Sequence, residues 1–173
     1  RAYYVPVSHR MDDLVEHREK SDRLQLLNGI WKFRYLKSIY DAQDKFYEPG
    51  YGTQDFGETE VPGVWQMAGY DTHQYTNIRY PFPFDPPYVP QDIPCGEYVT
   101  TFDYAKDTDA AKAYLNFEGV DSCFYAAIQI KIFVIVSHII ISVSSTLILC
   151  DARRIILLCP LQRFFKITAI QIG

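Results

Sequence analysis

Apolar and polar side chains alternate along three separate segments of the chain. Trp31, Phe33 and Tyr35 fall on one face of the first segment, and Lys32 and Arg34 fall on the other. Residues 97–104 and 113–120 repeat this period of two. Successive side chains of a β-strand point to opposite faces, so a period of two is typical of a half-buried strand. The pattern therefore predicts three half-buried strands.

In the second and third segments, alternate residues are predicted to fall on one face of each strand. The two predicted faces are Tyr98, Thr100, Phe102 and Tyr104, and Ala113, Leu115 and Phe117. Loops rich in glycine and proline separate the segments, and this arrangement is typical of a β-sandwich. Residues 8–27 are polar and heavily charged, and predict a turn or two of helix at most. The expected fold is an all-β sandwich with an irregular N-terminal extension.

The composition of the chain changes after Ala127. The last 46 residues hold 13 isoleucines, whereas the first 127 residues hold four. Residues 1–127 carry 12 basic and 20 acidic groups, a net charge of −8, and the tail carries 5 basic groups and 1 acidic group, a net charge of +4. We therefore expect an extension at residues 1–26, an incomplete sandwich domain at residues 27–127 and an anomalous isoleucine-rich tail at residues 128–173.

Charge and cysteine usage narrow the class of protein. The acidic front part has no cluster of Lys and Arg, which argues against nucleic acid as a partner, because phosphate binding needs such clusters. The first residues lack a basic stretch followed by an apolar run, so no secretory signal is expected. The four cysteines form no C-x-x-C pair, which favours reduced thiols and a cytoplasmic location.

Residues 61–80 combine aromatic rings with small hydrogen-bonding side chains. The set comprises Trp65, Gln66, Tyr70, His73, Tyr75 and Asn77. Flat rings suit the C–H surfaces of a sugar, and amides pair with its hydroxyl groups. These residues therefore predict a carbohydrate-binding loop. Six prolines follow between Pro81 and Pro94 and predict an extended, pre-ordered surface segment, which we expect Phe82, Phe84 and Tyr88 to pin.

The sequence contains no familiar catalytic or metal-binding motif. G-x-G-x-x-G, Walker, H-E-x-x-H and G-x-S-x-G patterns are all absent, and the four histidines are too scattered for a zinc site. Glycoside hydrolysis needs two carboxyl groups with different pKa values. The loop carboxylates offer no feature that would separate their pKa values in this way; they are Glu58, Glu60, Asp71, Asp85 and Asp92. No catalytic residue is predicted.

Six short sequence blocks occur in a specific order between residues 1 and 125. They are residues 2–6 (AYYVP), 27–33 (LNGIWKF), 61–71 (VPGVWQMAGYD), 75–78 (YTNI), 86–90 (PPYVP) and 117–125 (FEGVDSCFY). In this order they resemble the N-terminal sugar-binding domain of the glycoside hydrolase family 2 β-galactosidases. The resemblance implies a jelly-roll-like, galactose-binding-domain-like β-sandwich.

The resemblance also implies a reaction. The family hydrolyses terminal non-reducing β-D-galactose residues in β-D-galactosides with retention, through a covalent galactosyl-enzyme. Its two catalytic glutamates lie on a (β/α)₈ barrel that follows the sugar-binding domain, so this chain is expected to be inactive alone and to bind substrate jointly with that barrel. Homo-oligomers, Mg²⁺ and Na⁺ are implied for the full-length enzyme, but no ligand for either ion is expected in this chain.

Two residues are the expected substrate contacts. Without the resemblance, Asn77 would be interpreted as a turn asparagine that supports its loop. With it, the Asn77 amide is implied to hydrogen-bond galactose, because an amide offers a donor and an acceptor without adding charge. Tyr75 is expected to line the same edge. Trp65 and Tyr70 are expected to pack in the core or against a neighbouring domain.

The tail departs from the family pattern, which continues after residue 125 with a strand, an Asn-Gly-type turn and a further strand. Gln129 and Ile130 stand where the turn is expected. A truncated or frameshifted chain is our first hypothesis. The alternatives are divergent strands at residues 128–136 and 146–150, or a membrane segment at residues 130–149 that would tether an interaction domain. A stand-alone carbohydrate-binding module is a further alternative function.

Overall fold

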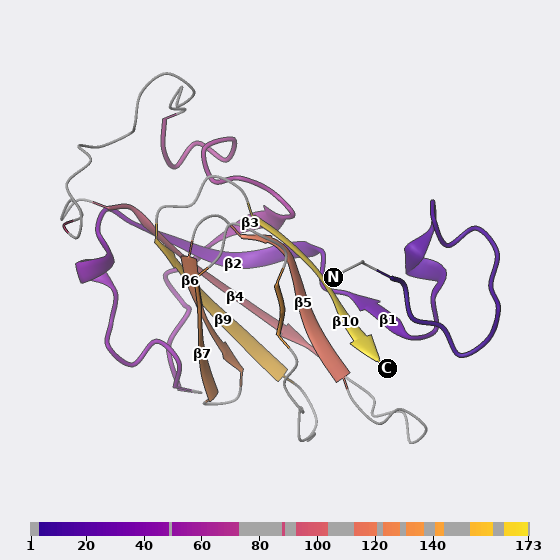
Figure 1. Cartoon of the computed structure of the whole chain (residues 1–173). Helices are drawn as coiled ribbons and strands as arrows, with labels where there is room; N and C mark the ends of the chain where they lie inside the picture. The colour runs from indigo at the N-terminus through magenta and orange to yellow at the C-terminus, as the bar shows by residue number, and fades with distance from the viewer. Residues whose placement is uncertain are drawn as a thin grey trace.

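A computed structural model shows two antiparallel β-sheets (Figure 1). It describes residues 4–48, 50–72, 88, 93–103, 113–120, 123–128, 131–136, 141–143, 153–160 and 165–172. The helical elements in this part of the chain are two short 3₁₀ turns, η1 (Arg18–Lys20) and η2 (Ile39–Asp41). The all-β sandwich predicted from the alternating pattern is confirmed.

The larger sheet has six strands in the order β3-β2-β4-β9-β6-β7. These strands are β2 (Gly29–Leu36), β3 (Gly57–Val61), β4 (Cys95–Phe102), β6 (Cys123–Ile128), β7 (Lys131–Val136) and β9 (Arg153–Pro160). The smaller sheet has the order β1-β10-β5-β8. Its strands are β1 (Leu24–Leu26), β5 (Ala113–Val120), β8 (Ile141–Val143) and β10 (Phe165–Ile172).

Strands from the isoleucine-rich tail occupy central positions in both sheets (Figure 1). β9 lies between β4 and β6, and β10 lies between β1 and β5. β-Branched residues such as isoleucine are enriched in strands, which fits this placement. β7 falls within residues 128–136, where divergent strands were one alternative, while residues 146–150 lie outside the described residues. In the part of the chain that the structure describes, no helix is long and apolar enough to cross a membrane.

The inner core lies between the two sheets. Its large buried side chains are Trp31, Phe33, Tyr98, Leu115, Phe117 and Phe124. The rings of Phe117 on β5 and Phe124 on β6 are 4.9 Å apart between centroids, so they join one sheet to the other. Trp31 also donates its indole N–H to the carbonyl oxygen of Leu27 at 2.8 Å. The alternation predicted for β2 is confirmed, because Trp31 and Phe33 are buried and Lys32 is exposed.

A second apolar cluster covers the outer face of the six-stranded sheet. Phe46 and Phe56 come from the connection between β2 and β3, and they pack on Cys95, Val99 and Ala127. We call residues 39–56 the covering segment. Because this segment buries the second face of β4, all the residues from Cys95 to Val99 are buried.

The half-buried strand predicted for residues 97–104 is therefore wrong in two respects. The strand spans Cys95–Phe102, and its first five residues are buried on both faces. The pattern of β4 alone does not reveal the covering segment, which is distant in sequence. Tyr104 lies outside the described residues.

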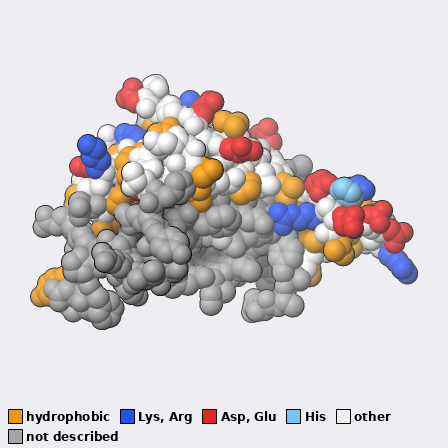
Figure 2. Space-filling model, turned by 90° about the horizontal axis from the view of Figure 1, so that it is seen from above, with side chains coloured by type: hydrophobic (Ala, Val, Ile, Leu, Met, Phe, Trp, Pro, Cys, Tyr) orange, Lys and Arg blue, Asp and Glu red, His pale blue; other side chains and the backbone are white. Residues whose placement is uncertain are grey.

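The last residues of the expected N-terminal extension form part of the sandwich. Charged side chains of both signs gather on the N-terminal segment at one end of the molecule (Figure 2). The Asp22 carboxylate accepts hydrogen bonds from the hydroxyl and the backbone N–H of Ser8, and these bonds lower the pKa of Asp22. Farther along, β1 pairs with β10, so the last residues of the extension belong to the smaller sheet.

Replacing Gly96 should destabilise the fold, because a Cβ at this position would lie 2.5 Å from the Trp65 ring and 2.9 Å from the Phe33 ring. Both rings belong to buried side chains that cannot move aside freely. We expect Gly96→Ala to lower the free energy of unfolding by about 1–3 kcal/mol, the usual cost of overpacking a core. Urea denaturation measures the difference.

Gly50→Ala is the matched control, since nothing lies within 4 Å of a Cβ at that position. It should change the free energy of unfolding by less than about 0.5 kcal/mol, as for most surface substitutions. Equal urea midpoints for the two variants would contradict the packing of Trp65 against Gly96.

Candidate functional site

A short turn after β3 carries the first residues of the predicted carbohydrate-binding loop. The N–H groups of Met67, Ala68 and Gly69 donate to carbonyl oxygens three residues earlier, at 3.1–3.2 Å. Gly69 has a φ of 84°, in the left-handed region that glycine adopts without a steric penalty. The turn therefore brings Trp65 and Tyr70 back over β2.

Four aromatic rings hold this turn against the sheet, and we call them the aromatic stem: Phe33, Tyr35, Trp65 and Tyr70. Trp65 lies edge-on to Tyr35 with centroids 5.5 Å apart, and Tyr70 lies edge-on to Phe33 at 4.8 Å. Tyr35 and Tyr70 are stacked at 6.2 Å. Trp65 is 2% exposed, so the core-packing role expected for it is confirmed.

The stem has two electrostatic features. Burial raises the pKa of the Tyr35 hydroxyl, and the nearby charge of Asp71 raises it further. The indole N–H of Trp65 is buried and finds no hydrogen-bond acceptor among the described residues. Neither group carries a charge near neutral pH, so neither adds charge to the stem.

The predicted substrate contacts Asn77 and Tyr75 lie outside the described residues. The described range that contains Trp65 and Tyr70 ends at Thr72, and Asn77 follows five residues later in the sequence. Of the three residues expected to pin the proline-rich segment, Phe82 and Phe84 also lie outside the described residues. Tyr88 is 73% exposed, so the expectation that it pins the segment is wrong.

A buried ion pair fixes the covering segment to the outer face of the sheet. Arg34 on β2 lies directly across from Glu97 on β4, and its Nε donates to the Glu97 carboxylate at 2.6 Å. The Tyr51 hydroxyl also contacts this carboxylate, at 3.1 and 3.3 Å from its two oxygens, and accepts a hydrogen bond from Arg34 Nη2. The Glu97 side chain is 0% exposed.

The surroundings of Arg34 keep it charged. Burial alone would lower the pKa of Arg34, but the hydrogen bond and the charge of Glu97, with Tyr51 and Asp55, outweigh that effect and raise it. The guanidinium group also lies over the rings of Phe56 and Tyr51, at 4.8 and 5.6 Å from their centroids. Cation–π contacts of this kind add to the ion pair. One arginine therefore contacts the sheet and two residues of the covering segment.

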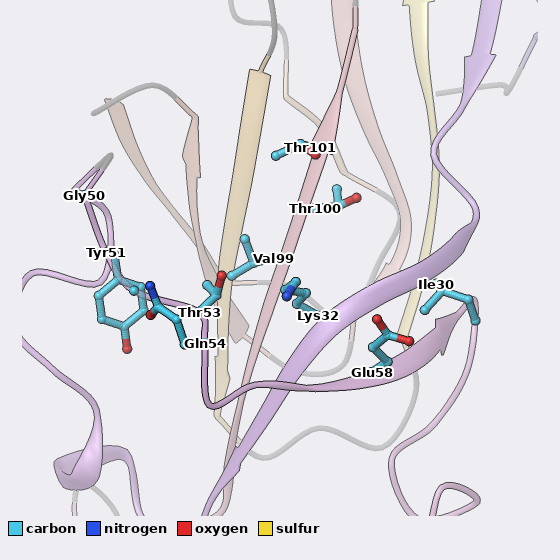
Figure 3. A pocket seen from close by; sticks show the side chains of 11 residues that line it. Ile30, Lys32, Gly50, Tyr51, Thr53, Gln54, Glu58, Val99, Thr100 and Thr101 are labelled. Carbon is cyan, nitrogen blue, oxygen red and sulfur yellow. The ribbon is translucent and has the colours of Figure 1, made fainter.

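An open pocket lies where β2 and β4 separate. The paired register of these strands ends at Lys32 and Val99, and the strands diverge beyond that point (Figure 3). The pocket has a volume of about 550 Å³. It is lined by Ile30 and Lys32 of β2, Glu58 of β3, Val99, Thr100 and Thr101 of β4, and residues 50–54 of the covering segment. We call it the fork pocket.

The fork pocket is mixed in polarity and balanced in charge. Lys32 and Glu58 are exposed cross-strand neighbours of opposite sign. Thr53, Gln54, Thr100 and Thr101 add hydroxyl and amide groups, and Ile30 and Val99 add apolar surface. The sequence did not predict this pocket, because no local pattern signals where two paired strands diverge.

The described residues hold neither a metal cluster nor an evident catalytic pair. Glu58 and Glu60 both lie on exposed positions of β3, and Asp71 directly follows Tyr70 in the sequence. Within the described ranges, no three His, Cys, Asp or Glu side chains lie close enough together to hold a metal ion. The Mg²⁺ and Na⁺ implied by the resemblance therefore have no ligand set among these residues.

Solved structures that match this fold include β-glucuronidases. The Ruminococcus gnavus β-glucuronidase in complex with uronic isofagomine matches with a TM-score of 0.55 and 13% identity, over 79% of this chain and 21% of that one. The apo form of that enzyme matches with a TM-score of 0.54, 13% identity and the same coverage. At this identity the likeness defines the fold alone: a β-sandwich of the kind found in these enzymes.

Sequence comparison identifies the family. The model of the glycosyl hydrolases family 2 sugar binding domain matches residues 24–136, and the chain belongs to this family. The β-galactosidase of Actinobacillus pleuropneumoniae is 44% identical over 129 residues, which cover 74% of this chain. The β-galactosidase of Staphylococcus xylosus is 41% identical over 130 residues, or 75% of this chain. The match spans only 12% and 13% of the lengths of these relatives.

Glu97→Gln should destabilise the protein, because it removes the charge that compensates Arg34. Breaking a fully buried pair costs about 3–5 kcal/mol. The Arg34 side chain is 24% exposed, so partial hydration should reduce the loss to about 2–3 kcal/mol. Urea denaturation monitored by tryptophan fluorescence measures it.

Glu48→Gln is the matched control. Glu48 pairs with Lys45 at 3.2 Å, but both side chains are largely exposed. Such surface pairs contribute about 0–1 kcal/mol, so the control should unfold close to the wild-type midpoint. If Glu97→Gln were as stable as the control, the buried pair would not hold the covering segment.

Proposed function

We propose that the chain is the sugar-binding domain of a β-galactosidase, an enzyme that hydrolyses terminal non-reducing β-D-galactose residues in β-D-galactosides. The observation that carries this proposal is the 44% identity over 129 residues to a β-galactosidase within a family 2 match. In this proposal the loop after the aromatic stem contributes to an active site on a separate (β/α)₈ barrel.

The proposal assigns no catalytic residue to this chain. Retaining glycosidases use two carboxyl groups about 5 Å apart, one as acid/base and the other as nucleophile. We place both on the barrel, so the chain alone should not hydrolyse a β-galactoside. Its contribution is substrate binding and orientation, which accelerate the reaction only in company with the barrel.

Asn77 is the proposed contact to galactose, and Tyr75 is proposed to line the same edge. A neutral amide can donate to one sugar hydroxyl and accept from another. The aromatic stem supports this role, because the buried rings of Phe33 and Trp65 pack with Tyr70 and Tyr35 and fix the backbone just before this loop. A loop that starts from a rigid base loses less conformational entropy when it binds a ligand.

A graft tests the proposed role of Asn77. Residues of this chain that match the Actinobacillus pleuropneumoniae β-galactosidase replace the corresponding segment of that enzyme. We expect an active chimera. Asn77→Ala in the chimera should lower kcat/KM for a β-galactoside by about 10- to 100-fold, the effect of losing one or two hydrogen bonds to substrate.

Asn28→Ala in the same chimera is the control, because Asn28 is another amide of this chain and is exposed. It should leave kcat/KM within about twofold, as expected for a surface substitution. An active chimera that tolerates Asn77→Ala would show that Asn77 does not contact the substrate. A folded but inactive chimera would contradict the proposed equivalence of the two domains.

A stand-alone carbohydrate-binding module is the second candidate. The fork pocket favours it, because the pocket is built entirely from residues of this chain. The two candidates differ in whether the chain binds a saccharide without the barrel.

A further inference from the structure

We propose that the fork pocket binds a neutral saccharide. None of its lining residues belongs to the loop that carries Asn77 and Tyr75. The site would therefore bind sugar with residues of this chain alone. The inference rests on the second candidate function proposed above and is independent of the role proposed for Asn77. Together with the proposed role of Asn77, this site gives the domain two contacts to carbohydrate.

The size and openness of the pocket suit a small sugar. Its volume of about 550 Å³ falls within the range of about 300–1,000 Å³ that is typical of small-molecule sites. Lys32, Gln54, Glu58 and Thr101 are exposed, so a ligand reaches them directly from solvent. An open site buries little ligand surface, and the expected dissociation constant is accordingly millimolar.

The polar side chains of the pocket are available for a ligand. Within the part of the chain that the structure describes, the side chains of Lys32, Gln54, Glu58 and Thr101 form no hydrogen bond or ion pair with one another or with other residues. Sugar hydroxyls both donate and accept hydrogen bonds, so they can pair with an ammonium group, a carboxylate and an amide at once.

The charges of the pocket select against ions. Lys32 and Glu58 lie opposite each other on β2 and β3, and Figure 3 shows Glu58 and Ile30 to the right of Lys32 and Thr100 and Thr101 above it. An anionic ligand that approaches Lys32 also meets the carboxylate of Glu58, and a cationic ligand meets Lys32. A neutral polyhydroxylated ligand avoids both penalties.

The wall formed by the covering segment is held in place before a ligand arrives. Tyr51 lines the pocket, and its hydroxyl is fixed by Arg34 and the buried Glu97. Gly52, Thr53 and Gln54 follow it directly. Because the anchor precedes these residues, the wall is pre-organised, which reduces the entropic cost of binding.

Isothermal titration of the full chain with lactose tests the proposal. We expect saturable binding in the millimolar range. Gln54→Ala and Glu58→Ala should each weaken it by about fivefold or more, which corresponds to one lost hydrogen bond. Gln43→Ala, an exposed amide on the covering segment outside the pocket, should bind lactose as the wild type does. Thermal melts confirm that each variant is folded.

D-glucuronate is a second probe, because its carboxylate should be repelled by Glu58. The wild type should bind this anion more weakly than lactose, and Glu58→Gln should improve its binding by removing the like charge. Tighter binding of glucuronate than of lactose by the wild type would overturn the assignment of a neutral ligand.

Asn77→Ala separates this site from the proposed active-site loop. Lactose binding that survives Asn77→Ala but falls in Gln54→Ala supports the fork pocket. Binding that disappears in Asn77→Ala and is unchanged in Gln54→Ala and Glu58→Ala would overturn it and assign the sugar to the loop. No saturation with lactose at concentrations well above the millimolar range would also overturn it, while the chimera test of Asn77 would be unaffected.

Discussion

The buried carboxylate of Glu97 is the constraint on which the outer half of the structure depends. A carboxylate that is fully removed from water must be paired and hydrogen-bonded, and Arg34 and Tyr51 meet both needs. Tyr51 belongs to the covering segment. Because Glu97 on β4 needs the Tyr51 hydroxyl as a partner, it fixes this long connection to the sheet, which otherwise packs through a few side chains such as Phe46 and Phe56. Phe46 and Phe56 then seal the outer face. Specific polar pairing and non-specific apolar burial thus act together.

The two faces of β2 have different roles in this arrangement. Phe33 and Tyr35 point to one face, where they pack with Trp65 and Tyr70 to form the aromatic stem. Lys32 and Arg34 point to the other face, where the first lines the fork pocket and the second anchors Tyr51. The two-residue period of a strand therefore places the aromatic stem and the fork pocket on opposite faces of one strand.

The sequence predicts the inner half of the sandwich well and the outer half poorly. The alternation around Trp31 and Phe33, and again around Leu115 and Phe117, identifies the inner core because each of these strands has one apolar face there. Glu97 appears as an ordinary strand carboxylate, since its burial comes from residues 39–56, which are distant in sequence and lack a clear period. The fork pocket depends on where the register of β2 and β4 ends, and no residue type marks that point. The predicted role of Asn77 as a substrate contact rests on the family resemblance alone.

Native-state hydrogen exchange on the wild type and on Tyr51→Phe tests most directly whether Glu97 holds the covering segment. The substitution leaves the Arg34–Glu97 pair intact and removes only the hydroxyl that ties the segment to it. We expect faster exchange for amides of residues 46–56, with little change in β5 and β6 of the inner core. Equal acceleration in the inner core would mean that the hydroxyl contributes only to global stability. Unchanged exchange in the covering segment would contradict its anchoring by the buried carboxylate.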